Sequence, residues 1–317
     1  MAGPGRRAKG GALLAAACLA ALPAAAQGVK TFSAQDLMKG TTATREQCAA
    51  LPRSVFVEAL GERICIRYYM SGPAQGRSAT VFFPGDSFGA DPKGRLVPDP
   101  GYLTQAPEYL DAAVRVWSQR LGSPVIFFGR MGLHGSSGWH GNRRTRLEVA
   151  VTRAALDAIK VREGVTGFAV VGQSGGGLLA AAALAARDDV SCAAIASAPL
   201  DFNAFARRFG ITVRLDGKRA HYDGLADVPA AAARTGSRVI VLTDPDDKDV
   251  PASTQTPYVE ALRAAGARPL HLFTAGRLNH ALTEKAMFAT ALCLSGKPDQ
   301  EIEKRYGRTA ADDLPPP

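Results

Sequence analysis

Short apolar runs alternate with helical stretches along most of this 317-residue chain, between residues 54 and 294. The runs that are typical of β-strands are 54–60, 63–70, 79–85, 124–129, 168–172, 192–198, 238–244 and 270–273. The helical stretches are 107–121, 143–160, 176–186, 256–266 and 281–294. Since a connection between parallel strands must cross over the sheet, this alternation predicts a mostly parallel sheet with helices on both faces.

The predicted fold class is α/β, with a doubly wound sheet of roughly eight strands in one domain. The first two strands, joined across Gly61–Glu62, predict an antiparallel N-terminal hairpin at one edge. A polar insertion, 200–227, interrupts the alternation before the seventh strand. The expected organisation is a signal peptide (1–26), an N-terminal extension (27–47), the folded domain (48–297) and a flexible C-terminal tail (298–317).

The first 26 residues have the pattern of an export signal. Arg6, Arg7 and Lys9 precede the apolar stretch 11–22, and 24–26 are alanines, the small residues that a signal peptidase requires. The apolar stretch is too short to span a bilayer comfortably, although an uncleaved anchor is the alternative. The sequence therefore predicts an exported protein, periplasmic or secreted, without a stable membrane span.

Four cysteines follow the predicted signal peptide: Cys48, Cys65, Cys192 and Cys293. An even number in an exported chain predicts two disulfides, because oxidising compartments favour them. Of the three pairings, Cys48–Cys65 is favoured because these two are close in sequence, which leaves Cys192–Cys293. Four unconnected buried thiols are the alternative. The cysteines lack CxxC spacing and paired histidines, so no metal site is expected.

Without the predicted signal peptide, the chain has 35 basic and 29 acidic side chains, a net charge of +6. The basic residues are scattered, and no basic stripe is interleaved with aromatic residues. Nucleic-acid binding is therefore not expected, and a mildly basic solvated surface is the better interpretation. The sequence carries no indication of the oligomeric state.

The chain segment Gly172-Gln173-Ser174-Gly175-Gly176 joins the strand at 168–172 to the helix at 176–186. In this context, G-x-S-x-G holds a serine on a sharp turn, with its hydroxyl exposed and the positive end of a helix behind it. The turn resembles the nucleophile elbow of the α/β-hydrolase superfamily. The segment 130–138, Arg-Met-Gly-Leu-His-Gly-Ser-Ser-Gly, resembles the R/D-x-G-x-x-G-x-S loop of the same superfamily.

This resemblance covers about residues 54–295 and implies a serine hydrolase with Ser174 as its nucleophile. Such a serine needs a histidine base and an acid that orients the base. In the superfamily the histidine follows the last strand, which implies His280. His271 lies within an apolar strand and His221 within the insertion, so both are expected to have other roles.

The acid of the superfamily follows the strand at 238–244 and stands three residues before the valine of a Val-Pro pair. The pair at 250–251 therefore implies Asp247. Asp244 is the second candidate and Asp201 the third, and each of these aspartates has an alternative role in a turn or helix cap. The resulting order along the chain, serine, aspartate, histidine, is that of α/β hydrolases.

Acyl transfer also needs N–H donors for the carbonyl oxygen as it becomes an anion. The N–H of Gly175, directly after the nucleophile, is the first candidate. The turn 84–87, Pro-Gly-Asp-Ser, resembles the His-Gly-x oxyanion turn of the superfamily with proline in place of histidine, which implies the Asp86 N–H as the second donor. A carboxylate directed at the anion would be unfavourable, so we expect the Asp86 side chain to point outward and hold the loop.

His134 and Gln173 are candidates for the substrate pocket because they lie in the two loops that carry the resemblance. The insertion 200–227 carries aromatic and basic residues that would accept an acyl or peptide chain and favour an anionic group; an irregular solvated loop explains it equally well. These residues are Phe202, Phe205, Phe209, Arg207, Arg208, Arg214, Lys218 and Arg219.

The first functional hypothesis is a carboxylesterase that cleaves a small-molecule ester by two-step acyl transfer, without a cofactor. The second is a serine peptidase or amidase of the same superfamily, acting on a peptide substrate. A noncatalytic binding protein on a hydrolase scaffold is the hypothesis from a different class. Such proteins usually lack a member of the triad, and all three residue types are present here.

Overall fold

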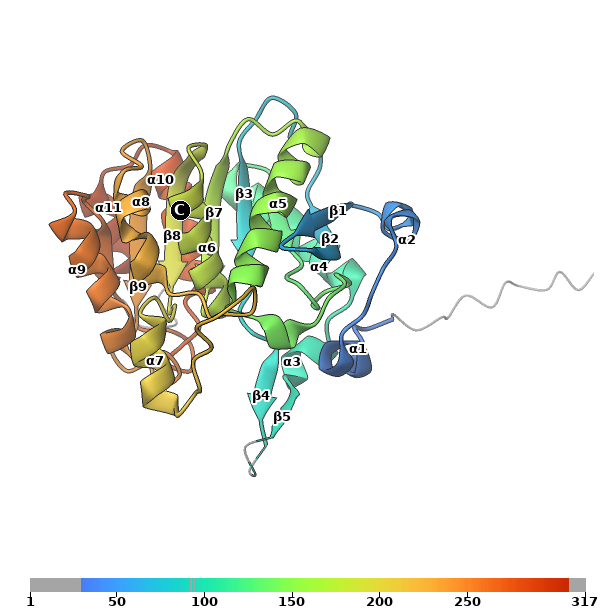
Figure 1. Cartoon of the computed structure of the whole chain (residues 1–317). Helices are drawn as coiled ribbons and strands as arrows, with labels where there is room; N and C mark the ends of the chain where they lie inside the picture. Colours follow the sequence, from blue (N-terminus) through green and yellow to red (C-terminus); the bar gives the residue numbers. More distant parts are fainter. Residues whose placement is uncertain (1–29, 92, 94, 308–317) are drawn as a thin grey trace, which may run out of the picture. The chain divides into compact units, whose positions relative to one another are not determined.

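The computed structural model describes residues 30–91, 93 and 95–307, and the predicted signal peptide lies outside them. From Thr31 onward the chain forms one unit around an eight-stranded sheet with the order β1-β2-β6-β3-β7-β8-β9-β10 (Figure 1). Its strands are β1 (Ser54–Ala59), β2 (Glu62–Met70), β3 (Ala79–Phe83), β6 (Val125–Phe128), β7 (Phe168–Gln173), β8 (Val190–Ala196), β9 (Arg238–Thr243) and β10 (Leu270–Phe273). The predicted fold class is confirmed.

The direction of the strands is also as predicted. β1 pairs antiparallel with β2, and β2 pairs antiparallel with β6, whereas the remaining pairs from β6 to β10 are parallel. The chain winds from β3 to β6 on one side and continues with β7 on the other side of β3. The order of strands therefore reverses at β3, and loops at the carboxyl ends of β3 and β7 diverge there, which is where open α/β sheets place their sites.

Helices cover both faces of the sheet. One core contains side chains from α5 (Arg146–Glu163), α6 (Gly175–Ala186), α8 (Val228–Ala232) and α9 (Thr256–Ala264). A second core contains side chains from α4 (Pro107–Leu121), α10 (Thr283–Leu294) and α11 (Asp299–Tyr306). Figure 1 shows α5 and α6 in front of the sheet, with α4 and α10 behind it. This arrangement is the doubly wound one that the alternation predicts.

Both ends of the described chain are more ordered than predicted. The expected N-terminal extension contains α1 (Ala34–Lys39) and the start of α2 (Arg45–Ala50), and Leu37 of α1 is buried against Tyr102 and Leu133. The expected flexible tail begins with α11, whose Ile302 and Tyr306 are buried in the second core. The prediction of a flexible tail is therefore wrong for 299–306, because two apolar residues at helical spacing dock this short helix.

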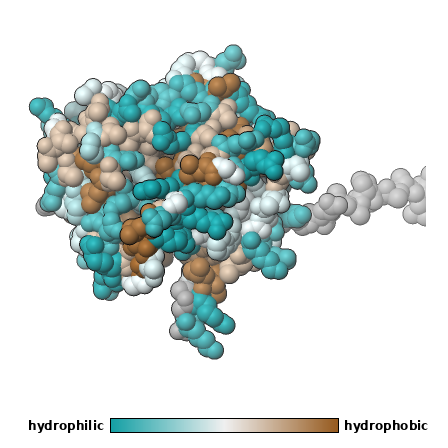
Figure 2. Space-filling view, in the orientation of Figure 1, coloured by the Kyte–Doolittle hydropathy of each residue, from teal (hydrophilic) through white to brown (hydrophobic). Residues whose placement is uncertain are grey.

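Two smaller groups of elements lie outside the main alternation. A hairpin of β4 (Phe88–Ala90) and β5 (Leu96–Pro98) follows β3 and leads into α3 (Pro100–Leu103). The insertion before β9 contains α7 (Phe202–Phe209). Figure 2 shows mostly hydrophilic residues on one face of the molecule, with apolar residues in small separate patches. No helix in the described part of the chain is long and apolar enough to cross a bilayer.

The structure contains both disulfides of the favoured pairing. Cys48–Cys65 joins α2 to β2 across 17 residues, and Cys192–Cys293 joins β8 to α10 across 101 residues. The second disulfide closes a loop that includes β9, β10 and the connections that follow them. It therefore ties the centre of the sheet to the helix that begins just after His280.

Candidate active site

Ser174 lies on the turn between β7 and α6 with φ 55° and ψ −126°. A positive φ is rare for a residue with a Cβ, and it is the strain expected of a sharp turn that presents a nucleophile. A Cβ on Gly172 would collide with the backbone of Gly176, and a Cβ on Gly176 would collide with the carbonyls of Phe83 and Pro84. The close approach of β3 therefore requires glycine at 176, and the close approach of the start of α6 to the end of β7 requires glycine at 172.

Asp247 and His280 meet through a side-chain hydrogen bond. Nδ1 of His280 lies 2.8 Å from Oδ2 of Asp247. Oδ1 of Asp247 accepts the N–H groups of Asp249 and Val250 at 2.9 and 2.8 Å, which fixes the carboxylate. The Asp247 side chain is fully buried, whereas that of His280 is 24% exposed. The carboxylate therefore orients the imidazole and leaves Nε2 directed away from the aspartate, as a general base requires.

The loop that carries His280 is bonded to the residue before Ser174. Nε2 of Gln173 donates to the carbonyl of His280 at 3.0 Å, and Oε1 of Gln173 accepts the N–H of Leu282 at 2.9 Å. Oγ of Ser197 donates to the same carbonyl at 3.0 Å. These bonds hold the His280 loop against the turn of Ser174. The Gln173 side chain thus braces two loops, a role that the sequence analysis missed.

The other two candidate acids, Asp244 and Asp201, accept hydrogen bonds from backbone N–H groups and do not contact His280 among the described residues. Oδ2 of Asp244 accepts the N–H of Gly276 at 2.6 Å, and Oδ1 accepts the N–H of Asp246 at 2.9 Å. Asp201 caps α7 by accepting the N–H of Ala204 at 2.7 Å. Of the three candidates, Asp247 is the one that contacts His280 in the part of the chain that the structure describes.

The carboxylate of Asp86 lies among three guanidinium groups in the turn after β3. Oδ1 is 2.8 Å from Nη1 of Arg130, and Oδ2 is 3.1 Å from Nε of Arg143 and 2.5 Å from Nη2 of Arg144. Burial by itself would raise the pKa of Asp86, but the charges of Arg144, Arg130 and Arg143 outweigh it and hold this pKa well below its usual range. The carboxylate is therefore ionised and holds the loop.

Arg130 links the same turn to α5. Its Nε and Nη2 bind the two oxygens of Glu148 at 2.9 and 3.0 Å, and Nη1 also donates to the carbonyl of Pro84 at 3.1 Å. The Arg130 side chain is completely buried, so this bidentate pair and the contact with Asp86 are shielded from water. The arginine thereby holds the turn on both sides of Gly85, at Pro84 and at Asp86.

The turn held by Arg130 lies against Ser174. A Cβ on Gly85 would be 3.5 Å from the Cβ of Ser174. Within the described residues the N–H of Asp86 makes no hydrogen bond. The N–H of Gly175 is the first in α6, a position that has no partner within a helix. The N–H groups of Gly175 and Asp86 therefore have no partner among the described residues and belong to segments that adjoin the serine.

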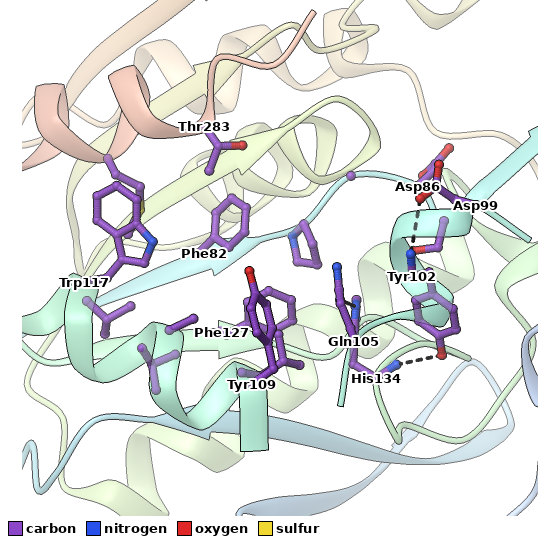
Figure 3. Close-up of a pocket in the computed structure, with 18 residues that line it drawn as sticks. Phe82, Asp86, Asp99, Tyr102, Gln105, Tyr109, Trp117, Phe127, His134 and Thr283 are labelled. Carbon is purple, nitrogen blue, oxygen red and sulfur yellow. Dashed lines mark hydrogen bonds between the residues drawn. The ribbon is translucent and has the colours of Figure 1, made fainter. Parts of the chain in front are cut away.

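A cavity of about 440 Å³ lies beside the Pro84–Asp86 turn (Figure 3). Figure 3 shows Trp117 at one end, Phe82, Phe127 and Tyr109 around the centre, and Gln105 with His134 toward the other end. The sequence-based candidate His134 therefore lies in a cavity wall, whereas Gln173 is not among the residues that line the cavity.

His134 is neutral in this wall. Its Nε2 lies 3.0 Å from Oε1 of Gln105. The centroid of its ring lies 5.3 Å from that of Phe32 and 5.2 Å from that of Tyr102. Burial, reinforced by the charge of Arg130, lowers the pKa of His134 to about 3. The N–H of Phe32 also donates to the carbonyl of Gln105 at 3.0 Å, so the segment before α1 supports both polar residues of the wall.

Two further histidines and the insertion have structural contacts. Nε2 of His271 in β10 lies 2.9 Å from Oγ1 of Thr243, and Nδ1 of His221 accepts the N–H of Arg214 at 2.9 Å. Burial lowers the pKa of His271 and that of His221 to about 4. Two aromatic side chains of the insertion, Phe202 and Phe205, pack in one buried cluster with Val250. They support the loop after Asp247 and lie outside the cavity.

Asp247, Asp249 and His280 are the group of described residues whose side chains approach one another closely enough to be considered for a metal, with ligand atoms within 4.8 Å. Nδ1 of His280 is already bonded to Asp247, and Oδ1 of Asp247 accepts two backbone N–H groups. These polar atoms are therefore satisfied by one another, and the arrangement fits a hydrogen-bonded pair.

Comparison with protein families and with curated proteins finds no match for this sequence. Solved structures do match. An esterase from Pyrococcus furiosus is 13% identical with a TM-score of 0.52, over 85% of this chain and 98% of the esterase. An acylaminoacyl peptidase from Pyrococcus horikoshii is 12% identical with a TM-score of 0.52, over 84% of this chain and 43% of the peptidase.

A puromycin hydrolase is 18% identical with a TM-score of 0.51, over 78% of this chain and 40% of that protein. At these identities the likeness shows the fold. These structures are α/β hydrolases, and the chain described here has the same fold. The fold that the two sequence motifs imply is therefore the fold that the structure has.

Proposed function

We propose that this protein is a serine hydrolase that cleaves an ester by two-step acyl transfer. The observation that carries the proposal is the Asp247–His280 hydrogen bond, on a loop that Gln173 holds against the turn of Ser174. A strained serine, an oriented imidazole and a buried carboxylate are the three groups that this chemistry needs.

In the first step, Oγ of Ser174 attacks the carbonyl carbon of the ester while Nε2 of His280 takes the hydroxyl proton. The carboxylate of Asp247 stabilises the imidazolium that forms. When the tetrahedral intermediate collapses, the C–O bond to the alcohol breaks and His280 returns the proton to the leaving oxygen. Water then attacks the acyl-serine with the same base, releasing the acid and free Ser174.

The N–H groups of Gly175 and Asp86 are the donors for the negative oxygen of the tetrahedral intermediate. Both lie beside the serine, and the Asp86 N–H has no partner among the described residues. The N-terminus of α6 adds a favourable dipole at the same place. A donor of this kind contributes about 3 kcal/mol to stabilising a transition state.

Labelling with a fluorophosphonate tests the nucleophile. The expected result is one adduct on Ser174 and loss of p-nitrophenyl ester hydrolysis by at least about 10³-fold in Ser174→Ala. Ser78→Ala is the matched control, because this exposed serine precedes β3 at the opposite end of that strand. Unchanged hydrolysis in Ser174→Ala, or no adduct on the folded wild-type protein, would refute the proposal.

Amide cleavage by the same groups is the alternative activity, because the fold also occurs in an acylaminoacyl peptidase. Hydrolysis of p-nitrophenyl acyl esters compared with aminoacyl-nitroanilides separates the two. We expect the higher kcat/KM with esters. A higher kcat/KM with nitroanilides would assign the protein to the peptidases instead.

We also propose that the protein is exported, since disulfides persist in oxidising compartments and the structure holds two of them. Expression of the full chain in a bacterium, followed by N-terminal sequencing of the periplasmic or secreted protein, tests this proposal. Cleavage after Ala26, with Gln27 as the new N-terminus, is the expected result. Protein that stays in the cytoplasm with an intact N-terminus would contradict it.

A further inference from the structure

We infer that the cavity beside the Pro84–Asp86 turn binds the acyl group of the substrate, and that this acyl group is neutral, apolar and large enough to include an aromatic ring. The inference rests on the proposed function, since it assigns a substrate class to the same site. It is carried by four observations: which end of the substrate the cavity adjoins, the charge of its walls, the aromatic side chains in them, and the size of the cavity.

The position of the cavity selects the acyl side of the ester. Pro84, Gly85 and Asp86 line it, so it adjoins the turn proposed to bind the carbonyl oxygen. Among the described residues neither Ser174 nor His280 lines it, so the Pro84–Asp86 turn is what places the cavity at the carbonyl group. The leaving alcohol must lie at His280, because that residue returns the proton to it. The cavity therefore receives the other substituent of the carbonyl carbon, which is the acyl chain.

The described side chains that line the cavity offer no positive charge to an anionic acyl group. Among the described residues that line the cavity there is neither lysine nor arginine. The carboxylate of Asp86 is bound by Arg130 and its neighbours, and that of Asp99 accepts the N–H of Tyr102 at 3.2 Å. Transfer of a carboxylate into such surroundings without a cation is costly. A neutral acyl group meets no such cost.

Aromatic side chains form much of the remaining wall. Phe82 and Phe127 lie edge to face at 5.7 Å, and Figure 3 shows them facing the same hollow as Tyr109 and Trp117. Ring faces and edges of this kind favour another ring or an alkyl chain. The Gln105–His134 pair adds uncharged hydrogen-bonding groups toward one end.

The size of the cavity excludes an acetyl group as its best occupant. A volume of about 440 Å³ falls within the range of small-molecule sites. A single methyl group would leave most of this space to water. Each methylene that the wall buries is expected to raise kcat/KM about fourfold, which follows from the free energy of burying one methylene group.

A series of p-nitrophenyl esters with a constant leaving group tests the assignment in the wild-type protein. We expect kcat/KM to rise from acetate through butyrate to hexanoate, and to be high for 3-phenylpropanoate. The succinate monoester, which places a carboxylate in the same position, should react at least about tenfold more slowly than the butyrate. Acetate esters of alcohols of increasing length should differ little, once they are compared at equal leaving-group pKa.

A pair of variants on one helix gives a matched control. Ala113 of α4 lines the cavity and is partly exposed, so Ala113→Phe fills the cavity without disturbing a tightly packed position. Ala112 is exposed and does not line it. We expect Ala113→Phe to lower kcat/KM at least about tenfold for hexanoate and 3-phenylpropanoate and less than about twofold for acetate. Ala112→Phe should leave the whole series unchanged.

Three results would overturn the inference: a flat acyl series in the wild-type protein, a preference that follows the alcohol, or an equal loss for acetate and hexanoate in Ala113→Phe. The wild-type series decides the matter even where a variant does not fold. Failure of the proposed function looks different, because Ser174→Ala would then keep its activity. An active, Ser174-dependent esterase with a flat acyl series would refute only the assignment of the cavity.

Discussion

Arg144, whose backbone φ is 58°, places its Nη2 2.5 Å from Oδ2 of Asp86 in the turn beside Ser174. Its own N–H donates to the carboxylate of Glu148 at 2.7 Å. One residue in a left-handed conformation therefore contacts both Asp86 and Glu148. These two acids form a buried ion cluster with Arg130, Arg143 and Arg144. This cluster determines where the proposed oxyanion donor lies.

The Asp86→Asn variant is expected to lose about 3 kcal/mol of stability, because it leaves buried guanidinium groups without their counter-charge. The backbone N–H remains, but the turn loses the ion pairs that hold it, so kcat should fall while KM changes little. Urea unfolding and steady-state kinetics measure the two effects. An unchanged kcat in a folded variant would contradict the positioning role of the carboxylate.

The ion pairs of Asp86 also make the stability of the protein depend on pH in the acid range. The folded pKa of Asp86 is lowered, so its contribution is present above the unfolded pKa of about 4 and is lost as pH falls toward the folded pKa. The stability difference between the wild type and Asp86→Asn should be constant from about pH 7 to 5 and shrink below about pH 4. Melting curves across this range measure it, and a difference that grows in acid would be the contrary result.

Buried histidines make the stability of the protein depend on pH in a second range, above that of Asp86. The folded pKa of His134 is lowered to about 3 and that of His271 to about 4. Since the unfolded chain takes up these protons near pH 6.5, stability should decrease as pH falls from about 6.5 toward 4. The variant His271→Gln should reduce the slope of this decrease, measured by urea unfolding. A wild-type stability that rises over this interval would show that the buried histidines do not dominate it.

The bracing role of Gln173 predicts a kinetic effect without substrate contact. In Gln173→Glu the side chain can no longer donate to the carbonyl of His280, and it places a negative charge there. We expect kcat to fall by about 10–10²-fold with KM nearly unchanged, because the imidazole shifts relative to Ser174. Ser197→Ala removes one bond to the same carbonyl without adding charge, and its loss should be smaller. A purely raised KM in Gln173→Glu would place this side chain at the substrate instead.

The two disulfides are expected to differ in their contribution to stability. Cys192–Cys293 closes 101 residues and Cys48–Cys65 closes 17. If each disulfide acts by lowering the entropy of the unfolded chain, these loop lengths correspond to stabilisation free energies of about 4.7 and about 3 kcal/mol. Denaturant unfolding of the serine double variants of each pair measures the difference. The opposite order would mean that strain or residual structure outweighs loop length.

The main sheet could be predicted because its strands are continuous apolar runs, which only a sheet covered on both faces accommodates. The helix Pro107–Leu121 also has the predicted bounds, since a proline stands at its start and Gly122 ends it in a left-handed conformation. The helix α11 was missed because its two buried residues, Ile302 and Tyr306, are too few to give a pattern among charged neighbours.

Within the site, the sequence indicated the loops, and the superfamily motifs indicated Ser174, Asp247 and His280. The contacts among Asp86, Arg130 and Glu148 could not be predicted, because they join residues that are far apart in sequence and share no spacing rule. The role of Gln173 was hidden for the same reason, as its partners lie more than 100 residues away. Long-range polar contacts of this kind depend on the finished fold.

Phe32 stands only five residues after Gln27, the expected start of the mature chain, and yet it packs on His134 and holds Gln105. Removal of N-terminal residues beyond residue 31 would thus remodel a wall of the proposed acyl-binding cavity. Recombinant versions that start later are expected to fold around the same sheet but to discriminate poorly between long and short esters. The residues around Phe32 should therefore be kept when the protein is shortened or tagged, because they support the wall that is proposed to select the substrate.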